Sequence, residues 1–291
     1  MDKNICNICP RACGADREKG RGFCSVPSEM YISRIALHAW EEPPISGTRG
    51  SGTVFFSGCN LRCVFCQNKK ISRSAAGRVY SEDELIDEML RLEGEGAHNI
   101  NLVTPTHYAK VVAKVLDKAK PRLNIPIVWN SGGYESVETL KMLDGLVDVY
   151  LPDLKYYSSE LSARYSSAPD YFEVAKMSLA EMHRQVGAVR FDGDGMLEKG
   201  IIVRHLVLPS CRRDSIKVLE ELAKILPANE IKVSIMRQFT PDFVDGEKYP
   251  ELNRRLTSFE YDSVVKRAGE LGFDGYTQGA ESARAVYTPD F

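Results

Sequence analysis

The sequence predicts an α/β protein built on a parallel sheet. From residue 52 onward, short apolar runs rich in β-branched and aromatic residues alternate with longer amphipathic segments. About six such strand–helix units follow one another, and this alternation is typical of a parallel sheet with helices outside it. Right-handed crossovers then give either an open doubly wound sheet or a curved barrel.

Each predicted strand is a short apolar run. The runs lie at residues 52–58, 99–105, 125–133, 147–156, 200–209 and 231–239, with a further short strand at 274–278. Polar or glycine-containing stretches end several of them, among them "VTPTH", "WNSGG", "LPDLK" and "RQFTP". Because the carboxyl ends of parallel strands meet at one edge, we expect these stretches to surround a common mouth.

The predicted helices separate these strands. They lie at residues 81–96, 107–120, 136–146, 171–187, 214–226 and 258–272. The first is the best marked, because Ser81 and Glu84 have the spacing of a capping box. Its apolar residues fall on one helical face, and glycines at 94 and 96 end it.

Composition and charge exclude several classes of protein. The 291 residues carry a formal net charge of −2, which does not indicate nucleic acid as a partner. No apolar run approaches the roughly 20 residues needed to span a bilayer, and "MDKNICNICP" is not a signal pattern. We therefore expect a cytoplasmic protein without a membrane partner. Thiols stay reduced there, so clustered cysteines indicate metal ligands or catalysts.

Three cysteines lie within eight residues of the loop "GCNLRCVFCQN", here called the three-cysteine loop (residues 58–68). Cys59, Cys63 and Cys66 have the spacing C-x3-C-x2-C. A structural zinc needs four ligands, and no fourth Cys or His lies nearby in the sequence. An iron–sulfur cubane held by three thiolates keeps one iron open to a substrate or cofactor. A zinc loop or three buried thiols is the alternative.

This loop, with aromatic Phe65 before its last cysteine, resembles the cluster loop of the radical S-adenosylmethionine (SAM) superfamily. The resemblance implies a [4Fe–4S] cluster on the three cysteines, with the amino and carboxylate groups of SAM on the open iron. Reduction would then yield a 5′-deoxyadenosyl radical that abstracts a hydrogen atom. The implied fold is a partial (β/α)6 barrel, which matches the six units. We expect it at residues 51–291, after an irregular, Cys-rich, metal-binding extension at residues 1–50.

Longer segments resemble pyruvate formate-lyase activating enzyme-like proteins, in an uncharacterised iron–sulfur branch: "EEPPISGTRGSGTVFFSGCNLRCVFCQN", "INLVTPTHY" and "VRHLVLP". By this resemblance Asp153 and Lys155 of "LPDLK" match a D-x-K motif that contacts the amino acid end of SAM. A structural ion pair is the alternative. Where activating enzymes have a Gly-Gly-Glu-like motif, this sequence has "VTPTHY", so hydroxyls and carbonyls of Thr104 and Thr106 would replace a carboxylate.

Further SAM contacts are expected at other strand ends. Asn130 and Ser131 are candidates for the ribose or the ammonium, and the glycines after them permit a close approach of the backbone. Arg204 and His205 point to opposite faces, and by resemblance to activating enzymes we expect Arg204 to face inward. Gln238, at the sixth strand end, lies where relatives place a polar contact. Cys211 is expected to be inert packing.

Four further cysteines form the N-terminal cysteine segment (residues 6–24). Cys6, Cys9, Cys13 and Cys24 have the spacing C-x2-C-x3-C-x10-C, which closes a tetrahedral site. Zinc or a second [4Fe–4S] cluster satisfies it, and zinc knuckles are the commoner at such irregular spacing. The basic residues around these cysteines are expected to be solvated, with docking of an acidic protein or nucleic acid as the alternative; they are Arg11, Arg17, Lys19 and Arg21.

Three functions follow from these patterns. The resemblance implies a radical SAM oxidoreductase, and more closely an activase that makes a glycyl radical on a partner polypeptide. It also implies an electron donor such as flavodoxin or ferredoxin. The second function keeps this chemistry but acts on a small molecule or a peptide residue. The third is a non-catalytic zinc-knuckle binding protein, and the intact three-cysteine motif argues against it.

Overall fold

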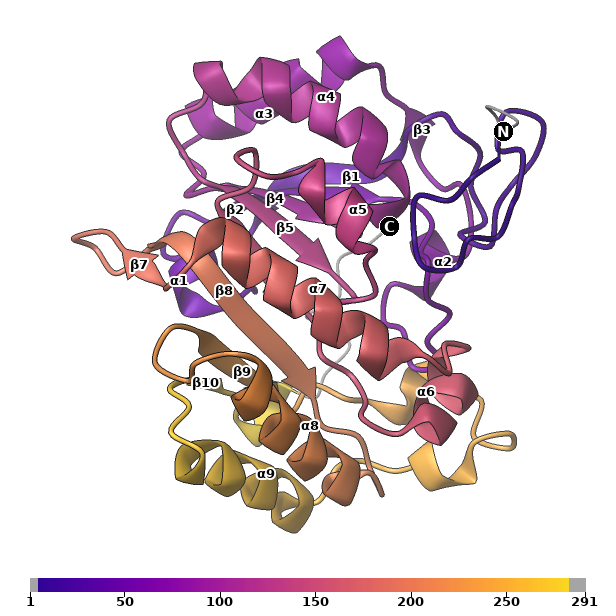
Figure 1. Ribbon diagram of the computed structural model, residues 1–291, viewed down its shortest axis with the longest axis vertical. Coiled ribbons are helices and arrows are strands. Elements are labelled where there is room, and N and C mark those ends of the chain that lie inside the picture. The colour runs from indigo at the N-terminus through magenta and orange to yellow at the C-terminus, as the bar shows by residue number, and fades with distance from the viewer. Residues whose placement is uncertain (1–4, 283–291) are drawn as a thin grey trace.

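The computed structural model describes residues 5–282, and ten strands of this part of the chain form one sheet (Figure 1). Its parallel strands are β2 (Ser51–Phe56), β4 (Ile100–Val103), β5 (Ile127–Ser131), β6 (Val149–Pro152), β8 (Leu197–Leu206), β9 (Lys232–Met236) and β10 (Gly275–Thr277). They are neighbours in the order in which the chain reaches them. Right-handed crossovers then place the connecting helices on one face, as in a barrel and unlike a doubly wound sheet. The predicted α/β fold, a partial barrel, is confirmed.

An antiparallel part precedes the barrel strands. β1 (Tyr31–His38) pairs with β2, with His38 opposite Ser51, and β3 (Arg78–Val79) pairs with β1. The sequence analysis treated residues 1–50 as irregular, whereas residues 31–38 belong to the sheet. Only Ile32 of β1 is buried, so its apolar signal is weak. Residues 1–4 and 283–291 of the two expected domains lie outside the described part, and the division at residue 50 stays a prediction.

Helices lie at the predicted positions: α3 (Glu82–Gly94), α4 (Ala109–Ala119), α5 (Val137–Lys141), α7 (Tyr171–Val186), α8 (Arg212–Ile225) and α9 (Ser258–Glu270). The capping box of α3 is confirmed. The Ser81 hydroxyl accepts from the Glu84 N–H at 3.2 Å, and the Glu84 carboxylate accepts from the Ser81 N–H at 2.8 Å. No helix among residues 5–282 is long and apolar enough to cross a membrane.

Several short elements were not predicted. They are α1 (Pro43–Ser46), α2 (Lys69–Ser72), α6 (Ser159–Ser166), β7 (Arg190–Phe191), which pairs with β8, and the 3₁₀ turns η1 (Thr106–Tyr108), η2 (Lys120–Arg122), η3 (Pro241–Phe243), η4 (Pro250–Leu252) and η5 (Ala280–Ser282). Each spans at most eight residues, too few for a helical period to show in the sequence.

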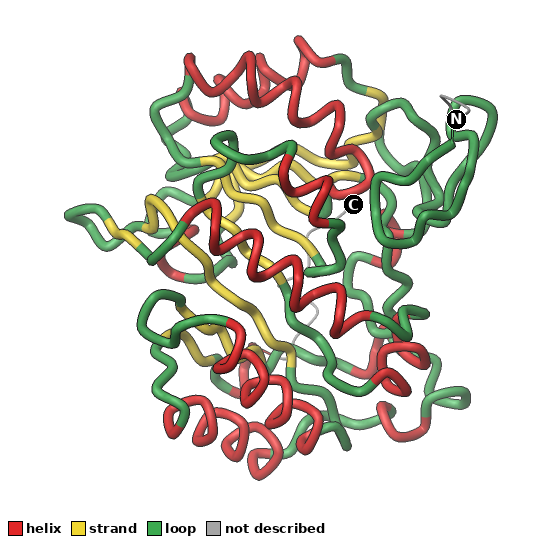
Figure 2. The backbone as a smooth tube through the Cα atoms, in the orientation of Figure 1, coloured by secondary structure: helices red, strands yellow, loops and turns green. Residues whose placement is uncertain are grey.

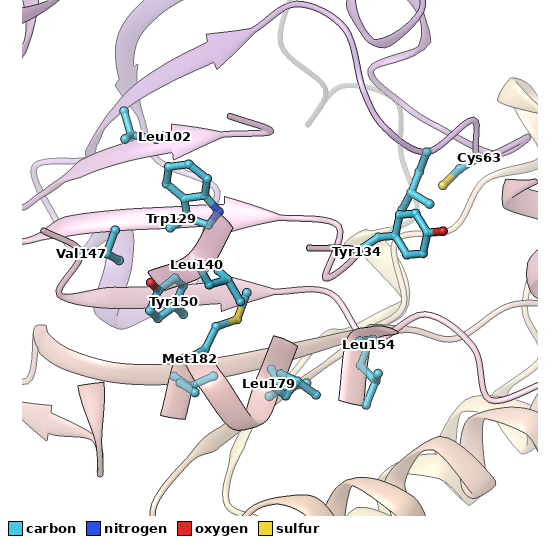
Figure 3. Close-up of a cluster of buried hydrophobic side chains, with 14 of the residues drawn as sticks. Cys63, Leu102, Trp129, Tyr134, Leu140, Val147, Tyr150, Leu154, Leu179 and Met182 are labelled. Carbon is cyan, nitrogen blue, oxygen red and sulfur yellow. The ribbon is translucent and has the colours of Figure 1, made fainter. Parts of the chain in front are cut away.

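The two faces of the sheet bury different clusters. Side chains that point toward the helices, such as Trp129 and Tyr150, belong to the large core, and Figure 3 shows them near Leu140 and Met182. On the concave face, Ile45 of α1 packs in a smaller cluster with Val128, Val149, Leu151, Leu197 and Ile202. Figure 2 shows the long helices outside the strands. The apolar cluster therefore fills one end of the concave face, and polar side chains occupy the other.

Two buried histidines make the stability of this fold sensitive to acid. His107 of η1 has its Nε2 2.7 Å from the Ser57 carbonyl, and the His205 Nδ1 of β8 lies 2.7 Å from the Leu154 carbonyl. Burial lowers the pKa of His107 to about 3, with Arg17 adding to the effect, and burial lowers the pKa of His205 to about 4. Both rings are therefore neutral in the folded protein at physiological pH.

The first prediction concerns pH. A histidine in the unfolded chain has a pKa of about 6.5, well above the pKa of either buried ring. As the pH falls through 6.5, protons therefore bind the unfolded chain before the folded one, and the stability present above pH 6.5 is lost. Each histidine should lower the free energy of unfolding by about 0.8 kcal/mol between pH 8 and pH 6. Anaerobic urea unfolding of the reconstituted protein at both pH values measures this loss. The His107→Gln/His205→Gln double variant should lose the pH dependence, and an unchanged slope would contradict the assignment.

Candidate functional site

The three-cysteine loop follows the carboxyl end of β2, as predicted. Cys63 is buried, while Cys59 and Cys66 are partly exposed. Each sulfur has a polar neighbour: the Leu61 N–H donates to Cys59 Sγ at 3.3 Å, the Ser166 hydroxyl donates to Cys63 Sγ at 3.0 Å, and Cys66 Sγ lies 3.5 Å from the Ser72 hydroxyl. Such donors stabilise sulfur that carries negative charge.

The three thiols share one low-dielectric environment. Burial raises the pKa of Cys59 and of Cys66, and the neighbouring Cys63 raises both further, whereas the Lys155 ammonium acts in the opposite direction. Deprotonation of Cys59 and Cys66 therefore needs a compensating cation. Among residues 5–282, no three His, Cys, Asp or Glu side chains stand close enough to share a single metal ion.

Beside the loop lies a buried ion-pair group at the ends of β6 and β8. The Lys155 ammonium donates to Asp153 Oδ2 at 2.5 Å, and Arg204 Nε donates to Asp153 Oδ1 at 2.9 Å. These three side chains are 14–16% exposed. Burial acts to raise the pKa of Asp153, but the two cations hold it below its ordinary value. Asp153 is therefore ionised, with both carboxylate oxygens in use.

Arg204 extends this group across the concave face. Its Nη2 donates to Asn130 Oδ1 at 2.6 Å and its Nη1 to Glu41 Oε2 at 3.1 Å. Burial raises the pKa of Glu41, although Arg204 opposes the effect. Sequence reasoning missed Glu41, because nothing in "EEPPISG" shows that this stretch enters the barrel between β1 and β2. Arg204 faces inward and His205 outward, so the two side chains lie on opposite faces as the alternation predicts, and Arg204 is the inward one as the resemblance implies.

The other predicted contacts at the ends of β4 and β5 do not share one environment. Thr104 ends β4 at a φ of 59°, a left-handed conformation that is strained for a β-branched residue. Ser131 lies on the opposite face of β5 from Asn130, and its hydroxyl accepts from the Gly133 N–H at 3.3 Å. The Thr106 hydroxyl donates to buried Glu135 at 2.7 Å, which directs it away from the concave face. Asn130 thus contacts the ion-pair group through Arg204, and the Thr104 N–H donates to the Asn130 carbonyl at 2.8 Å, whereas Ser131 and Thr106 have their partners elsewhere.

Gln238 follows β9 and lines a cavity of ≈ 210 Å³ beside Glu41, Glu42 and Arg204. Its side-chain oxygen accepts from Gln278 at 3.1 Å, and its carbonyl accepts from Gln67 of the three-cysteine loop at 3.2 Å. It therefore connects the loop to the far edge of the sheet. Cys211 lies outside this group: it is buried at the start of α8, and burial raises its pKa to about 12, which fits inert packing.

The glycines after β5 are needed for packing. Gly133 has a φ of 73°, and a Cβ on it would stand 2.1 Å from the Asp153 carbonyl oxygen. Gly133→Ala should therefore displace the end of β6 and weaken binding of the SAM that the sequence resemblance implies there at least tenfold, about 1.4 kcal/mol. Gly145 is the matched control, because its φ is 80° and nothing lies within 4 Å of its Cβ position. Calorimetric titration with SAM measures both variants, and equal affinities would contradict the prediction.

The N-terminal cysteine segment brings its cysteines toward one another. Cys9 and Cys24 are buried, Cys6 is partly exposed and Cys13 is exposed. A Cβ on Gly22 would stand 3.4 Å from Cys13 Sγ and 3.4 Å from Cys24 Sγ. Of the four basic residues, Lys19 and Arg21 are exposed as expected, whereas Arg11 is partly buried and Arg17 differs from the expectation of a solvated face. Arg17 is buried and donates to the carbonyls of Val26, His107 and Pro27, because these backbone groups lack partners in regular structure.

Comparison with known proteins identifies the family of this chain. Residues 53–191 match the family model of the Radical SAM superfamily. The uncharacterized protein MJ0674 of Methanocaldococcus jannaschii is 32% identical over 287 residues, covering 94% of this chain and 77% of that protein. The protein belongs to the radical SAM superfamily.

Solved structures show the radical SAM fold in this chain. A spore photoproduct lyase mutant with dinucleoside spore photoproduct has a TM-score of 0.52 at 12% identity, covering 77% of this chain and 74% of that chain. SuiB of Streptococcus suis bound to S-adenosylmethionine has a TM-score of 0.51 at 14% identity, covering 76% of this chain and 48% of that chain. At such identities the likeness concerns the fold alone.

The radical SAM family implies a [4Fe–4S] cluster and SAM, and the donors present fit both groups. Three thiols with hydrogen-bond donors at their sulfurs suit iron. A cation and a carboxylate in one buried group suit the two charged ends of an amino acid. Cys59, Cys63 and Cys66 would hold the cluster, and Asp153 and Lys155 would lie beside SAM.

Proposed function

We propose that this protein cleaves SAM reductively to a 5′-deoxyadenosyl radical and abstracts a hydrogen atom from a partner polypeptide, as a glycyl radical activating enzyme does. The observation that carries the proposal is the position of Lys155. Its ammonium bonds Asp153 at 2.5 Å, and its charge opposes the burial that raises the pKa of Cys59 and Cys66. A SAM molecule at this ammonium would therefore adjoin the thiols. When bound, the cluster supplies the electron for cleavage.

The chain's own residues would orient SAM. Lys155 suits the carboxylate of its methionine end, and Asp153 suits the ammonium, because their charges are opposite and both are buried. Thr104 stands at the end of β4, where activating enzymes have a Gly-Gly-Glu-like motif, and is our candidate for a second ammonium contact. Asn130, held by Arg204 at 2.6 Å, is the candidate for the ribose.

The interior cavity favours a single inserted residue as substrate. Its volume of ≈ 210 Å³ lies below the roughly 300–1,000 Å³ of pockets for drug-sized ligands. One residue of a flexible polypeptide loop fits such a space. A small molecule or another peptide residue is the second candidate. We place the reaction in the cytoplasm, because all eight cysteines are free thiols. Flavodoxin or ferredoxin is the proposed electron donor.

Two measurements test this function. Anaerobic protein with dithionite and SAM should form 5′-deoxyadenosine and methionine in equal amounts, measured by liquid chromatography. A candidate glycyl radical enzyme added to the mixture should then show a glycyl-type EPR doublet. Deoxyadenosine without a doublet on any candidate would support the second candidate function. No deoxyadenosine would favour the non-catalytic zinc-knuckle protein.

A further inference from the structure

The N-terminal cysteine segment lies against the three-cysteine loop, and contacts run in both directions. The Cys59 N–H donates to the Cys24 carbonyl at 3.3 Å, so a backbone hydrogen bond joins a cysteine of one segment to a cysteine of the other. Arg11 Nε donates to the Asn60 carbonyl at 2.8 Å, and Arg62 Nη2 donates back to the Phe23 carbonyl at 3.0 Å. Each segment therefore satisfies backbone groups of its partner.

Phe23 joins the same two arginines. The guanidinium of Arg11 lies 4.1 Å from the centre of its ring, and that of Arg62 lies 4.3 Å from it. Both distances fall within the range of cation–π attraction. Because Phe23 immediately precedes Cys24, its ring position and the Cys24 carbonyl position are coupled.

Arg11 is also connected to a second cysteine of the loop, Cys63, through Ser166. Its Nη2 donates to the Ser166 carbonyl at 3.0 Å, and its Nη1 bonds the Ser167 carbonyl. The Ser166 hydroxyl in turn donates to Cys63 Sγ at 3.0 Å. Arg11 lies between Cys9 and Cys13, so the fold of the N-terminal cysteine segment determines where its guanidinium stands.

The N-terminal cysteine segment has little regular structure to fix these positions. Residues 5–30 contain no helix or strand, only turns and one isolated bridge between Ile5 and Asp16. Ala12 and Ser25, next to Cys13 and Cys24, have positive φ angles of 38° and 68°. Such strained positions persist only when the surroundings hold them. Bonds from four thiolates to metal would supply that constraint.

We propose that Cys6, Cys9, Cys13 and Cys24 bind a second metal centre, and that this centre positions the three-cysteine loop through Cys24 and Arg11. The second part rests on the proposed function only in taking that loop as the cluster site. Four thiolates with no open position suit zinc or an iron–sulfur cluster. Since no three of these side chains stand close enough to share a single ion among residues 5–282, binding one zinc requires the sulfurs to turn inward.

Metal analysis tests the first part. The Cys59→Ala/Cys63→Ala/Cys66→Ala triple variant, purified anaerobically, should retain about one zinc, or about four iron with equal sulfide, per chain. Adding Cys6→Ser and Cys9→Ser should remove it. Zinc or iron with sulfide identifies the centre, and either result supports the site. A triple variant without metal, or with the four N-terminal thiols in disulfides, would overturn it. This readout does not depend on SAM cleavage.

Hydrogen exchange tests the second part in the reconstituted protein. In the Cys6→Ser/Cys9→Ser variant, amides of residues 58–64 should exchange at least ~10-fold faster, because the Cys59 N–H loses a fixed acceptor. Amides of α8 serve as the reference for a folded barrel. If these also lose protection, Arg11→Ala, which keeps all four thiols, carries the test.

Arg11→Ala should accelerate exchange in residues 58–64 and change the EPR spectrum of the reduced cluster, while second-metal content stays unchanged. Arg11→Lys keeps the positive charge but not the planar, forked set of N–H donors of the guanidinium. It should restore part of the exchange protection and part of the EPR spectrum. Lys19→Ala is the matched control in the same segment, because its side chain is 82% exposed and pairs only with Asp16 among the described residues. Unchanged protection and spectra in Arg11→Ala would overturn the positioning role.

Discussion

Replacing Cys59, Cys63 or Cys66 by alanine is expected to reduce 5′-deoxyadenosine formation at least ~10³-fold, about 4 kcal/mol in the activation barrier. Each of these cysteines supplies one of the three thiolates of the loop, and residues 58–68 hold no further cysteine to replace it. The measurement is deoxyadenosine by liquid chromatography, with iron content measured on the same samples. Iron bound by the loop should fall together with product.

Cys211→Ala is the control for this experiment. Cys211 is also buried, and its thiol pKa is raised to about 12 by burial, but it lies at the start of α8 outside the site. This variant should retain iron and turnover within about threefold, a difference below 1 kcal/mol. Full turnover by any single variant of the three-cysteine loop would contradict the assignment of its ligands.

Arg204→Met should cause the largest loss of folding stability. The substitution removes the cation that bonds Asp153 at 2.9 Å and Glu41 at 3.1 Å, and it leaves two buried carboxyl groups near each other. Removing one partner of a buried ion pair destabilises proteins by about 3–5 kcal/mol. We also expect weaker SAM binding, because Asp153 would lose its fixed orientation. Anaerobic urea unfolding and calorimetric titration measure the two effects.

Arg190→Met is the matched control for Arg204. Arg190 pairs with Glu198 at 3.0 Å on the β7–β8 hairpin, but its side chain is 66% exposed. Exposed pairs contribute about 0–1 kcal/mol, so its loss should be small. If both variants lost the same stability, the group on the concave face would not have the structural role described here.

Much of the fold follows from local patterns in the sequence. The strands of the barrel are short apolar runs, and α3 is marked by its capping box, so a pattern of a few residues identifies each. β1 escaped notice because only Ile32 in it is buried. Local patterns left the barrel and the doubly wound sheet open; the family resemblance implied the barrel, and the strand order, which depends on contacts between distant residues, confirms it.

The candidate site likewise combines residues that the sequence predicted with residues that it did not. Alternation placed Asp153 and Lys155 on one face, the resemblance to activating enzymes implied that Arg204 faces inward, and the structure joins the three side chains. Glu41 is 163 residues from Arg204 in the chain, and Arg11 is 155 residues from Ser166. Neither pairing has a local signature, since it arises when the sheet curves and the N-terminal cysteine segment packs against it.

The central claim is that the three-cysteine loop leaves one iron open to SAM. Its most direct test is EPR-based hyperfine spectroscopy of the reduced protein with SAM labelled by ¹⁵N and ¹⁷O in the methionine amino and carboxylate groups. The account predicts coupling of both labels to the cluster, and loss of that coupling in Cys63→Ala. A reduced cluster whose spectrum is unchanged by SAM, without coupling to either label, would contradict it.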